Sequence, residues 1–565
     1  MSNENAGNPD VLNFPRDTTL LRIAMASEER NRILREHYGL DPLSQMDGTK
    51  NKYVKLFKKF IDSHKGGPLS LTAICDDWYN LTRAGWHGWT DFLYTGVSAG
   101  TRGGDNENKT CVPSTNTVAG QDDFAGNPLF ACLDCVWAKN PDTLEPEIVA
   151  ICGITDGFER YNAEKFVGVL QQTGWFYQTE GAESWRFGYC SDFIDSVKSQ
   201  PLPEAVRLDG SVRPWVVHAK YLGHVVNGKW TCRAGVIPTA FISHNSEHTI
   251  GAATGPGISG WCYCDIDFLR KMMMIKYASL TLDGILQGCL NNNKTAKCAV
   301  SETGVKRLLL PSNAAAFEEG MGVFVGAINA SGAEISRNAT NYNISGSGGC
   351  IITAVETVTV EGTDYKAVYV DTPETFNTVS GETCICTFAW PTGSTDKVLG
   401  SDGSPGDPTT GVYPAKLQGI EYSVGVNIIP ADTIMEYTLE GSTYYAQLYM
   451  VDRTANQSTS VTNNYEPSGV KLEQPPASAW KYTKHMKLNT RGVFITSDYG
   501  GTSSTYFKDG FYICGATVGE REGHFGGNLF DGAVFGGLSL SCFGGGLGNA
   551  NWNTSGGPLE LSQKM

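Results

Sequence analysis

Residues 516–553 read ATVGEREGHFGGNLFDGAVFGGLSLSCFGGGLGNANWN. Glycines alternate here with four phenylalanines, Phe525, Phe530, Phe535 and Phe543. A glycine-rich segment is ordinarily a flexible linker. A linker does not use phenylalanine, because water disfavours exposed rings. We therefore expect these rings either to be buried or to bind a partner.

The composition of this stretch has a second peculiarity. From Gly523 to Asn551 it contains no Lys, Glu, Gln, Met or Trp. Those residue types cannot be reached when only the adenines of an AAC or AAT codon are replaced. The gap is typical of segments that are diversified at asparagine codons. A loop of small residues around a few aromatic rings would show the same gap, so this alternative stays open.

Three segments carry a resemblance to a known family. They are LQGIEYSVG at 417–425, YFKDGFYICGATVGERE at 506–522 and GLGNANWN at 546–553. Together they resemble the C-terminal part of phage and prophage tail receptor-binding proteins with a C-type-lectin fold, the major tropism determinant-like variable proteins of diversity-generating retroelements. Their scaffold is related to formylglycine-generating enzymes. The likeness extends over residues 161–553.

The resemblance implies a rigid lectin-like scaffold that displays diversified side chains on one face. Aromatic anchors with polar edges dominate such recognition surfaces, although we expect about half of the four rings to pack in the core. The residues expected to bind a receptor are Arg521, His524, Phe525, Asn528, Phe530, Asp531, Val534, Phe535 and Phe543.

Composition limits the class of protein. The chain has 565 residues, 41% of them hydrophobic and 18% charged, which is typical of folded domains. A net charge of −15 argues against binding to nucleic acid, which requires a basic surface. The sequence predicts neither a membrane-spanning run nor a signal peptide. We expect synthesis in a bacterial cytoplasm, incorporation into a virion tail, and sixteen reduced, mostly buried cysteines.

The predicted fold class is mainly β with few helices (α+β). A C-type-lectin-like domain is expected to carry an inserted small β barrel or sandwich and an N-terminal helical segment. The predicted divisions are a helical anchor at 1–66, an irregular aromatic-rich β region at 67–160, the first part of the lectin-like domain at 161–301, the inserted β module at 302–395, and the second part at 396–565.

Two helices are expected near the N-terminus, at residues 19–37 and after a Thr49 cap. The second has an apolar face formed by Tyr53, Leu56, Phe57, Phe60 and Ile61, and Gly66 is its expected stop. This pair could dock onto other tail or baseplate proteins or form a trimerising stalk. Alternatively, it could pack on the chain's own β domain.

The middle of the chain gives clearer local signals. Residues 166–170, 174–177 and 185–189 predict a three-stranded meander. Residues 212–222 are expected to pair with residues 230–232 through an Asn227-Gly228 turn. A buried helix is expected at residues 265–280, and five short strands are expected within residues 302–390.

Candidate catalytic and metal motifs are incomplete. His244 and His248 have the i, i+4 spacing of helical zinc ligands, but their polar neighbours favour a loop, and HExxH is absent. The HxxxHxE arrangement of sulfoxide synthases has Ile250 in place of its Glu. Formylglycine-generating oxidases need two closely spaced cysteines, whereas Cys514 and Cys542 lie far apart in sequence. We therefore expect no metal, no cofactor and no enzymatic activity.

The resulting hypothesis is a virion receptor-binding protein of a phage tail fibre or baseplate. We expect it to be a homo-oligomer, with a trimer favoured. Its partner would be a bacterial cell-surface glycan or protein. The alternatives are a structural virion protein, or a metalloenzyme of the formylglycine-generating type.

Overall fold

The computed structural model describes residues 52–83, 85–327, 342–532, 538, 540–542, 544–557 and 559–560. It is 37% strand and 13% helix, which confirms the predicted mainly β class. The helix expected at residues 19–37 and the Thr49 cap lie outside the described residues. None of the helices in the described ranges has the length and apolar character needed to cross a membrane.

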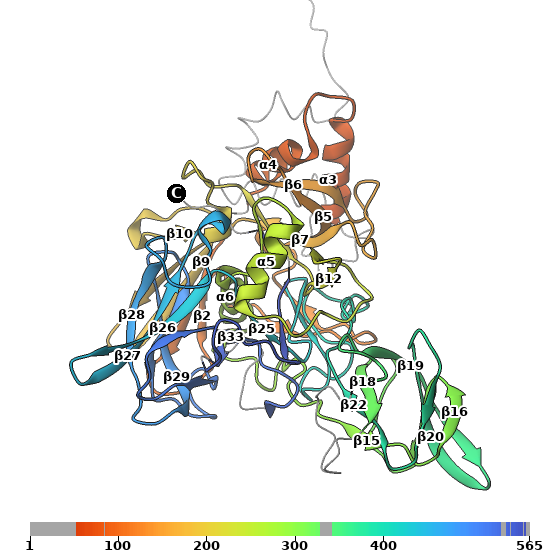
Figure 1. The fold of residues 1–565 in the computed structure, drawn as a ribbon. Coiled ribbons are helices and arrows are strands. Elements are labelled where there is room, and N and C mark those ends of the chain that lie inside the picture. Colours follow the sequence, from red (N-terminus) through yellow and green to blue (C-terminus); the bar gives the residue numbers. More distant parts are fainter. Residues whose placement is uncertain are drawn as a thin grey trace, which may run out of the picture.

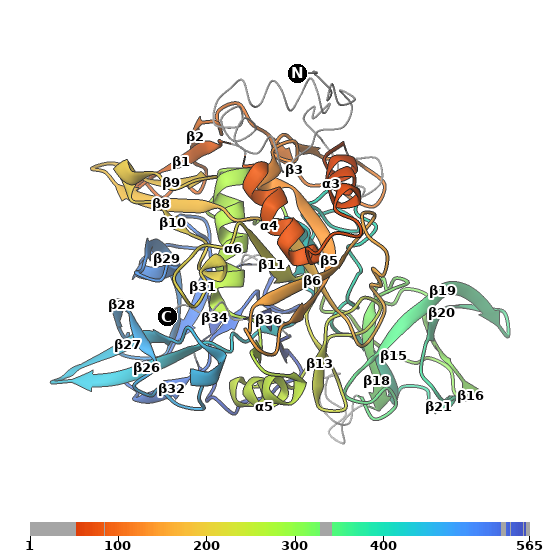
Figure 2. The same ribbon diagram turned by 90° about the horizontal axis from the view of Figure 1, so that it is seen from above.

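Helix α6 (Tyr263–Met272) lies at the centre of the molecule, with sheets around it (Figures 1 and 2). It continues into a π-helical turn, η4 (Met273–Tyr277), and ends at Ala278, which has a left-handed φ of 48°. Every residue of α6 is buried, as predicted for this helix, although four of its ten residues are charged. Those four residues form ion pairs inside the core. Asp267 bonds to both Arg270 and Lys271.

Two sheets formed by strands within residues 87–219 pack beside α6. One has the order β10-β8-β9-β1-β2 and the other β11-β7-β5-β6. Their strands are β1 (His87–Leu93), β2 (Thr101–Gly104), β5 (Cys132–Lys139), β6 (Pro146–Ile151), β7 (Phe166–Gln172), β8 (Trp175–Glu180), β9 (Ser184–Cys190), β10 (Gln200–Pro201) and β11 (Trp215–Ala219).

The predicted three-stranded meander is therefore wrong in its pairing. β8 and β9 form the expected hairpin, but β7 belongs to the other sheet, between β5 and β11. β7 is buried along nearly its whole length, a pattern typical of a strand in a sheet that is covered on both faces. The aromatic-rich region at 67–160 likewise supplies regular strands, β1, β5 and β6, to these sheets.

Helices α3 (Lys52–Ser63) and α4 (Leu71–Leu81) cover the β11-β7-β5-β6 sheet (Figure 2). Tyr53, Phe57, Phe60 and Ile61 of α3 are buried, as the periodicity predicts. Phe57 stacks on Trp78 of α4 with ring centroids 4.7 Å apart. The apolar face of α3 is thus covered by the chain's own domain.

The Asn227-Gly228 turn forms as predicted, but with a different first strand. Both residues have positive φ, 52° and 75°, as a type I′ hairpin requires. The turn joins β12 (His224–Val226) to β13 (Lys229–Thr231), whereas β11 pairs with β7. β11 is buried along its entire length, so it belongs in an interior sheet rather than in a surface hairpin.

Residues 295–387 form a β module that projects from the remainder of the chain (Figure 1). The five predicted strand segments are observed. The module also contains β15, which begins at Thr295, before the predicted boundary at residue 302. The sheet order is β15-β22-β18-β19-β20-β17, with β16 and β21 paired separately. The strands are β15 (Thr295–Lys297), β16 (Glu302–Val305), β17 (Arg307–Pro311), β18 (Gly322–Ala327), β19 (Cys350–Val360), β20 (Thr363–Val370), β21 (Phe376–Thr378) and β22 (Thr383–Thr387).

The C-terminal part forms two further sheets, β28-β27-β26-β32 and β30-β29-β31-β34-β33-β25-β35. The stretch at 516–553 contributes strands to both sheets. Their strands are β25 (Asn427–Ile428), β26 (Thr433–Glu440), β27 (Thr443–Met450), β28 (Glu466–Glu473), β29 (Ala479–Leu488), β30 (Phe494–Tyr499), β31 (Gly510–Ile513), β32 (Gly519–Arg521), β33 (His524–Phe525), β34 (Leu540–Cys542) and β35 (Thr554–Ser555).

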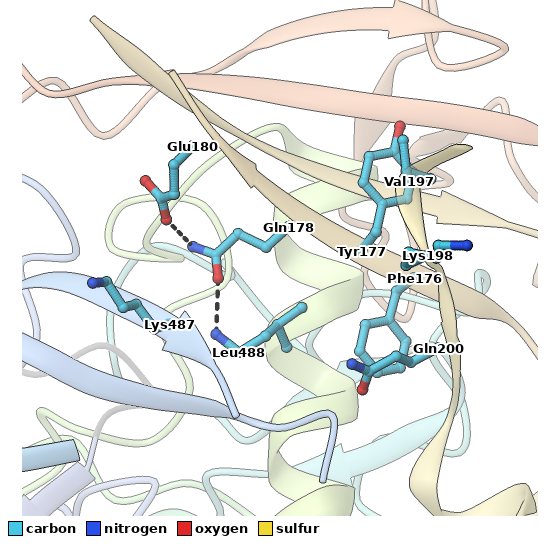
Figure 3. Close-up of a pocket in the computed structure, with 9 residues that line it drawn as sticks. All are labelled: Phe176, Tyr177, Gln178, Glu180, Val197, Lys198, Gln200, Lys487 and Leu488. Carbon is cyan, nitrogen blue, oxygen red and sulfur yellow. Dashed lines mark hydrogen bonds between the residues drawn. The ribbon is translucent and has the colours of Figure 1, made fainter. Parts of the chain in front are cut away.

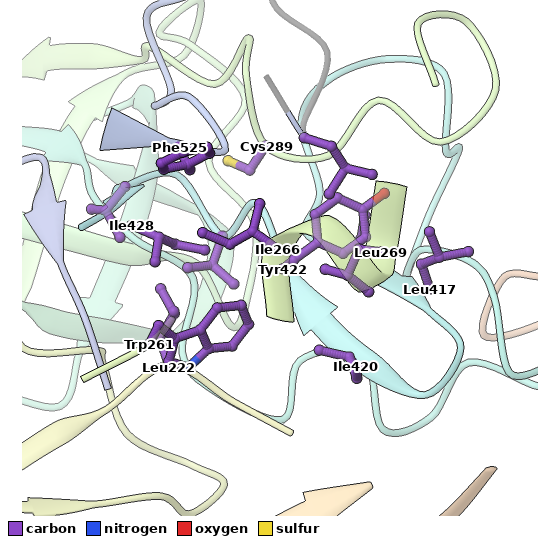
Figure 4. Packing of buried hydrophobic residues seen from close by; sticks show 14 of the residues in the cluster. Leu222, Trp261, Ile266, Leu269, Cys289, Leu417, Ile420, Tyr422, Ile428 and Phe525 are labelled. Atoms are coloured by element: carbon purple, nitrogen blue, oxygen red, sulfur yellow. The ribbon is translucent and has the colours of Figure 1, made fainter. Parts of the chain in front are cut away.

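The core joins these parts around α6. Figure 4 shows Trp261, Ile266 and Leu269 from the α6 region packing with Ile428 and Phe525 from the C-terminal sheet. Short pairs close the remaining connections: β3 (Cys111–Val112) with β4 (Gln121–Asp122), β14 (Ile258–Ser259) with β36 (Leu559–Glu560), and β23 (Ala415–Leu417) with β24 (Ile420–Tyr422).

Candidate functional site

The glycine- and phenylalanine-rich stretch begins on two strands that fix its position. Gly519 to Arg521 pair with β26, and after two intervening residues His524 and Phe525 pair with β34 in the other sheet. Glu522 and Gly523 make the crossing between the sheets. The start of the stretch is therefore part of the folded scaffold and not a linker.

Three of the predicted receptor-binding residues are buried. Phe525 is 0% exposed and meets Tyr263 edge-on, with ring centroids 5.1 Å apart. His524 and Asn528 are 7% and 8% exposed. Phe525 is thus a core residue in this structure and not an exposed contact. Side chains alternate along a strand, and the Phe525 ring lies on the face of β33 that packs against α6.

The loop that follows is held by its own polar side chains. The Asp531 carboxylate accepts hydrogen bonds from the Asn528 backbone N–H at 2.6 Å and from its Nδ2 at 3.0 Å. Asn528 Oδ1 in turn accepts the Phe530 N–H at 3.1 Å. Burial raises the pKa of Asp531 to about 6. Gly532 N–H is bound by the Leu290 carbonyl at 2.7 Å, which ties the loop to the scaffold.

This local network presents Phe530 at the surface. Phe530 is 47% exposed and lies edge-on to Trp552, with centroids 5.2 Å apart. Arg521 lies on β32 in the other sheet, partly buried, and its Nη1 donates to the carbonyl of Glu520. Val534, Phe535 and Phe543 lie outside the described residues.

Helix α5 (His244–Thr254) supports the last part of the stretch and corrects the predicted loop at this position. Ser243 and Ser246 form a reciprocal capping box, so the polar residues that suggested a loop are the start signal of a helix. The Asn245 N–H donates to the Leu547 carbonyl at 2.9 Å. The His244 N–H donates to Glu522 Oε2 at 3.1 Å, where a carboxylate is favoured by the helix dipole.

α5 brings the two histidines of the i, i+4 motif together. The Nε2 atoms of His244 and His248 are 3.5 Å apart. Burial lowers the pKa of His244 to about 3, with a further contribution from His248, and lowers the pKa of His248 to about 4. Nearby, Glu522 Oε1 and His524 Nε2 are 2.9 Å apart.

Glu247 on the same helix is enclosed by glycine backbone. Within the part of the chain that the structure describes, neither carboxyl oxygen has a hydrogen-bond partner. A Cβ at Gly556 would lie 1.4 Å from Oε1, and one at Gly260 would lie 1.8 Å from Oε2. Burial raises the pKa of Glu247 well above its usual value, so the protonated form is favoured. Sequence reasoning did not identify this residue.

Elsewhere in the core, Cys111, Asp122 and Asp402 form an acidic cluster. The thiol sulfur and the carboxylate oxygens of this cluster lie within 4.8 Å of one another. Lys276 lies among them: its Nζ is 2.9 Å from Asp122 Oδ2 and 2.7 Å from Asp402 Oδ2. Gln418 Oε1 is a further acceptor at 3.0 Å. The ammonium group therefore supplies the positive charge that this cluster needs, and the cluster is a buried ion network. No charge pattern along the chain indicated this network.

The cysteines behave as expected: those whose side chains are described are free thiols, and most are buried. The backbone of β31 lies beside that of β34, with Tyr512 opposite Cys542, which brings the segments of Cys514 and Cys542 to neighbouring strands. Cys132 and Cys135 of the CxxC motif are both buried on β5.

An open groove of 410 Å³ lies between β8 and β29, and none of the described residues of the 516–553 stretch lines it (Figure 3). Gln178 crosses it, donating to Glu180 Oε1 at 3.0 Å and accepting from the Leu488 N–H at 2.8 Å. Its amide therefore joins two sheets.

No protein-family model matches the chain, and no curated protein matches it.

Proposed function

We propose that the chain is a receptor-binding protein of a phage or prophage tail fibre or baseplate. In this proposal a C-type-lectin-like scaffold displays the stretch at 516–553 to a bacterial cell-surface glycan or protein. The proposal rests on the sequence resemblance and on the adenine-replacement pattern of the stretch.

One structural observation supports it most. Phe530 is a large, half-exposed ring on a loop whose backbone is fixed by Asn528, Asp531 and the Leu290 carbonyl. A rigidly held aromatic ring loses little conformational entropy on binding, and such rings are common anchors at recognition surfaces. Trp552 beside it extends the apolar surface.

The proposal assigns attachment to the N-terminal region at 1–66. Since the apolar face of α3 is covered, docking onto other tail proteins by α3 would use its exposed basic face, which carries Lys55 and Lys59. Several copies on one virion, for example in trimers, would increase avidity without any new contact.

The test is binding of the purified protein to a panel of bacterial strains and to a glycan array. The informative variant is Phe530→Ser, and the matched control is Phe193→Ser, which removes a ring of similar exposure, 51%, elsewhere on the surface. We expect about a tenfold or greater loss of binding for Phe530→Ser, as for a recognition hot spot, and no loss for the control. Unchanged binding by a folded Phe530→Ser protein would refute the role of this loop. Absence of binding by the wild-type protein to every strain and glycan would count against the whole proposal.

A further inference from the structure

Helix α5 places two imidazoles one turn apart on the same face. Their Nε2 atoms are 3.5 Å apart, and their ring planes are inclined by 56°. A zinc ion is held about 2.05 Å from each imidazole nitrogen, so two nitrogens at this separation would subtend an angle of about 117° at the ion, near the tetrahedral value. A hydrogen bond between the two nitrogens would be at the long limit for such bonds.

We propose that His244 and His248 form a binding site for a divalent transition-metal ion of the zinc type, with both Nε2 atoms as ligands. The pair has the spacing of helical zinc ligands. Imidazole binds metal in its neutral form, and burial favours that form. The inference does not depend on the proposed receptor binding.

The surroundings of the pair fit this role. His244 is fully buried, and its backbone is fixed by the bond to Glu522 and by the Ser243 cap, so its ring is held in place. His248 is only partly buried. An ion between the two rings would be approached from the side of His248, and water would have to supply the remaining ligands. Catalytic zinc centres also complete their coordination with water, although they usually have three protein ligands.

A metal ion bound on α5 would also affect the segment that this helix supports. A metal bound by residues i and i+4 links the first two turns of α5. In the first turn, the Asn245 backbone N–H donates a hydrogen bond to the Leu547 carbonyl. The bound ion would therefore stabilise the support of the 544–549 segment. A ligand that binds only the folded state stabilises it by mass action.

The first experiment is a titration of the chelator-treated, full-length protein with Co²⁺, followed by its visible absorption, and with Zn²⁺, followed by calorimetry. We expect one ion per chain. His248→Gln is the main variant, because its side chain is the less buried of the two. The control is His224→Gln, which removes another partly buried histidine, one that is bonded through Nδ1 to the Ile237 carbonyl.

We expect His248→Gln to weaken Zn²⁺ binding by about tenfold or more, and His224→Gln to leave it unchanged. Zinc should also raise the melting temperature of the wild type but not that of His248→Gln. X-ray absorption at the zinc edge of the wild type provides a test that needs no variant, and it should show two imidazole ligands. The proposal is overturned by no stoichiometric binding to the wild type, by unchanged affinity in His248→Gln, by equal loss in His224→Gln, or by a spectrum without two imidazoles.

Discussion

Replacement of Lys276 by Met should strongly destabilise the protein. The Lys276 ammonium is 0% exposed and lies within 3.0 Å of Asp122, Asp402 and Gln418. Methionine fills a similar volume but leaves two buried carboxylates without their cation. Breaking a buried ion pair from one side costs about 3–5 kcal/mol. We expect the free energy of unfolding to fall by that amount.

The assay is urea unfolding at pH 7, followed by circular dichroism and tryptophan fluorescence. Lys276→Met/Asp402→Asn should recover part of the loss, because it removes one of the uncompensated charges. Lys198→Met is the control, since Lys198 forms an exposed ion pair with Asp195, and such pairs contribute about 0–1 kcal/mol. A loss below about 1 kcal/mol for Lys276→Met would refute the reasoning that the ammonium neutralises this cluster.

The pH dependence gives a second check on the same network. Lys276 is the main cause that lowers the pKa of Asp402 below its usual value of 3.8, against the opposing effect of burial. A carboxyl with a lowered pKa stabilises the folded state above the unfolded pKa, and this contribution is lost as the pH falls through the folded pKa. The difference between wild type and Lys276→Met should therefore be present at pH 7 and shrink below pH 3.8.

Three further predictions concern other sites. Burial raises the pKa of Glu204 from 4.5 to about 7, so its stabilising contribution is present below pH 4.5 and lost as the pH rises to 7. Relative to Glu204→Gln, the wild type should lose about 3 kcal/mol of unfolding free energy between pH 4.5 and 8, measured by urea unfolding. Gly556→Ala should lower stability by about 1–3 kcal/mol in the same assay, because the new Cβ would meet Glu247, whereas Gly348→Ala, which has open space around it, should not. Asp531→Ala removes the acceptor of two hydrogen bonds in its loop and should increase hydrogen exchange there, while an unchanged exchange rate would contradict its role in ordering the loop.

The features that could be predicted from the sequence are those decided by neighbouring residues. The apolar face of α3 and the Asn227-Gly228 turn were predicted correctly, because helix periodicity and turn conformation are local properties. The partners of β7 and β11 were not, because the choice of sheet depends on residues far away in the chain. Local signals also misled at α5, where capping serines resembled a loop.

The candidate site divides in the same way. An exposed ring at Phe530 and a buried one at Phe525 could not be distinguished by composition, since both are phenylalanines among glycines. The network around Lys276 could not be predicted, because its members come from four separate segments. The i, i+4 spacing of His244 and His248 was visible in the sequence, and only their secondary structure was assigned wrongly.

The hydrogen bonds that fasten the glycine- and phenylalanine-rich stretch to the scaffold join mainly backbone groups. They connect Leu529 with Gly425, Gly532 with Leu290, Leu547 with Asn245, and Asn551 with Phe241. A main-chain amide or carbonyl is the same in every residue except proline, which lacks the N–H. Exposed side chains between these points, such as that of Phe530, can therefore be exchanged without breaking these backbone bonds. Under the proposed function, this backbone attachment would let the same fold present different exposed side chains on its binding surface.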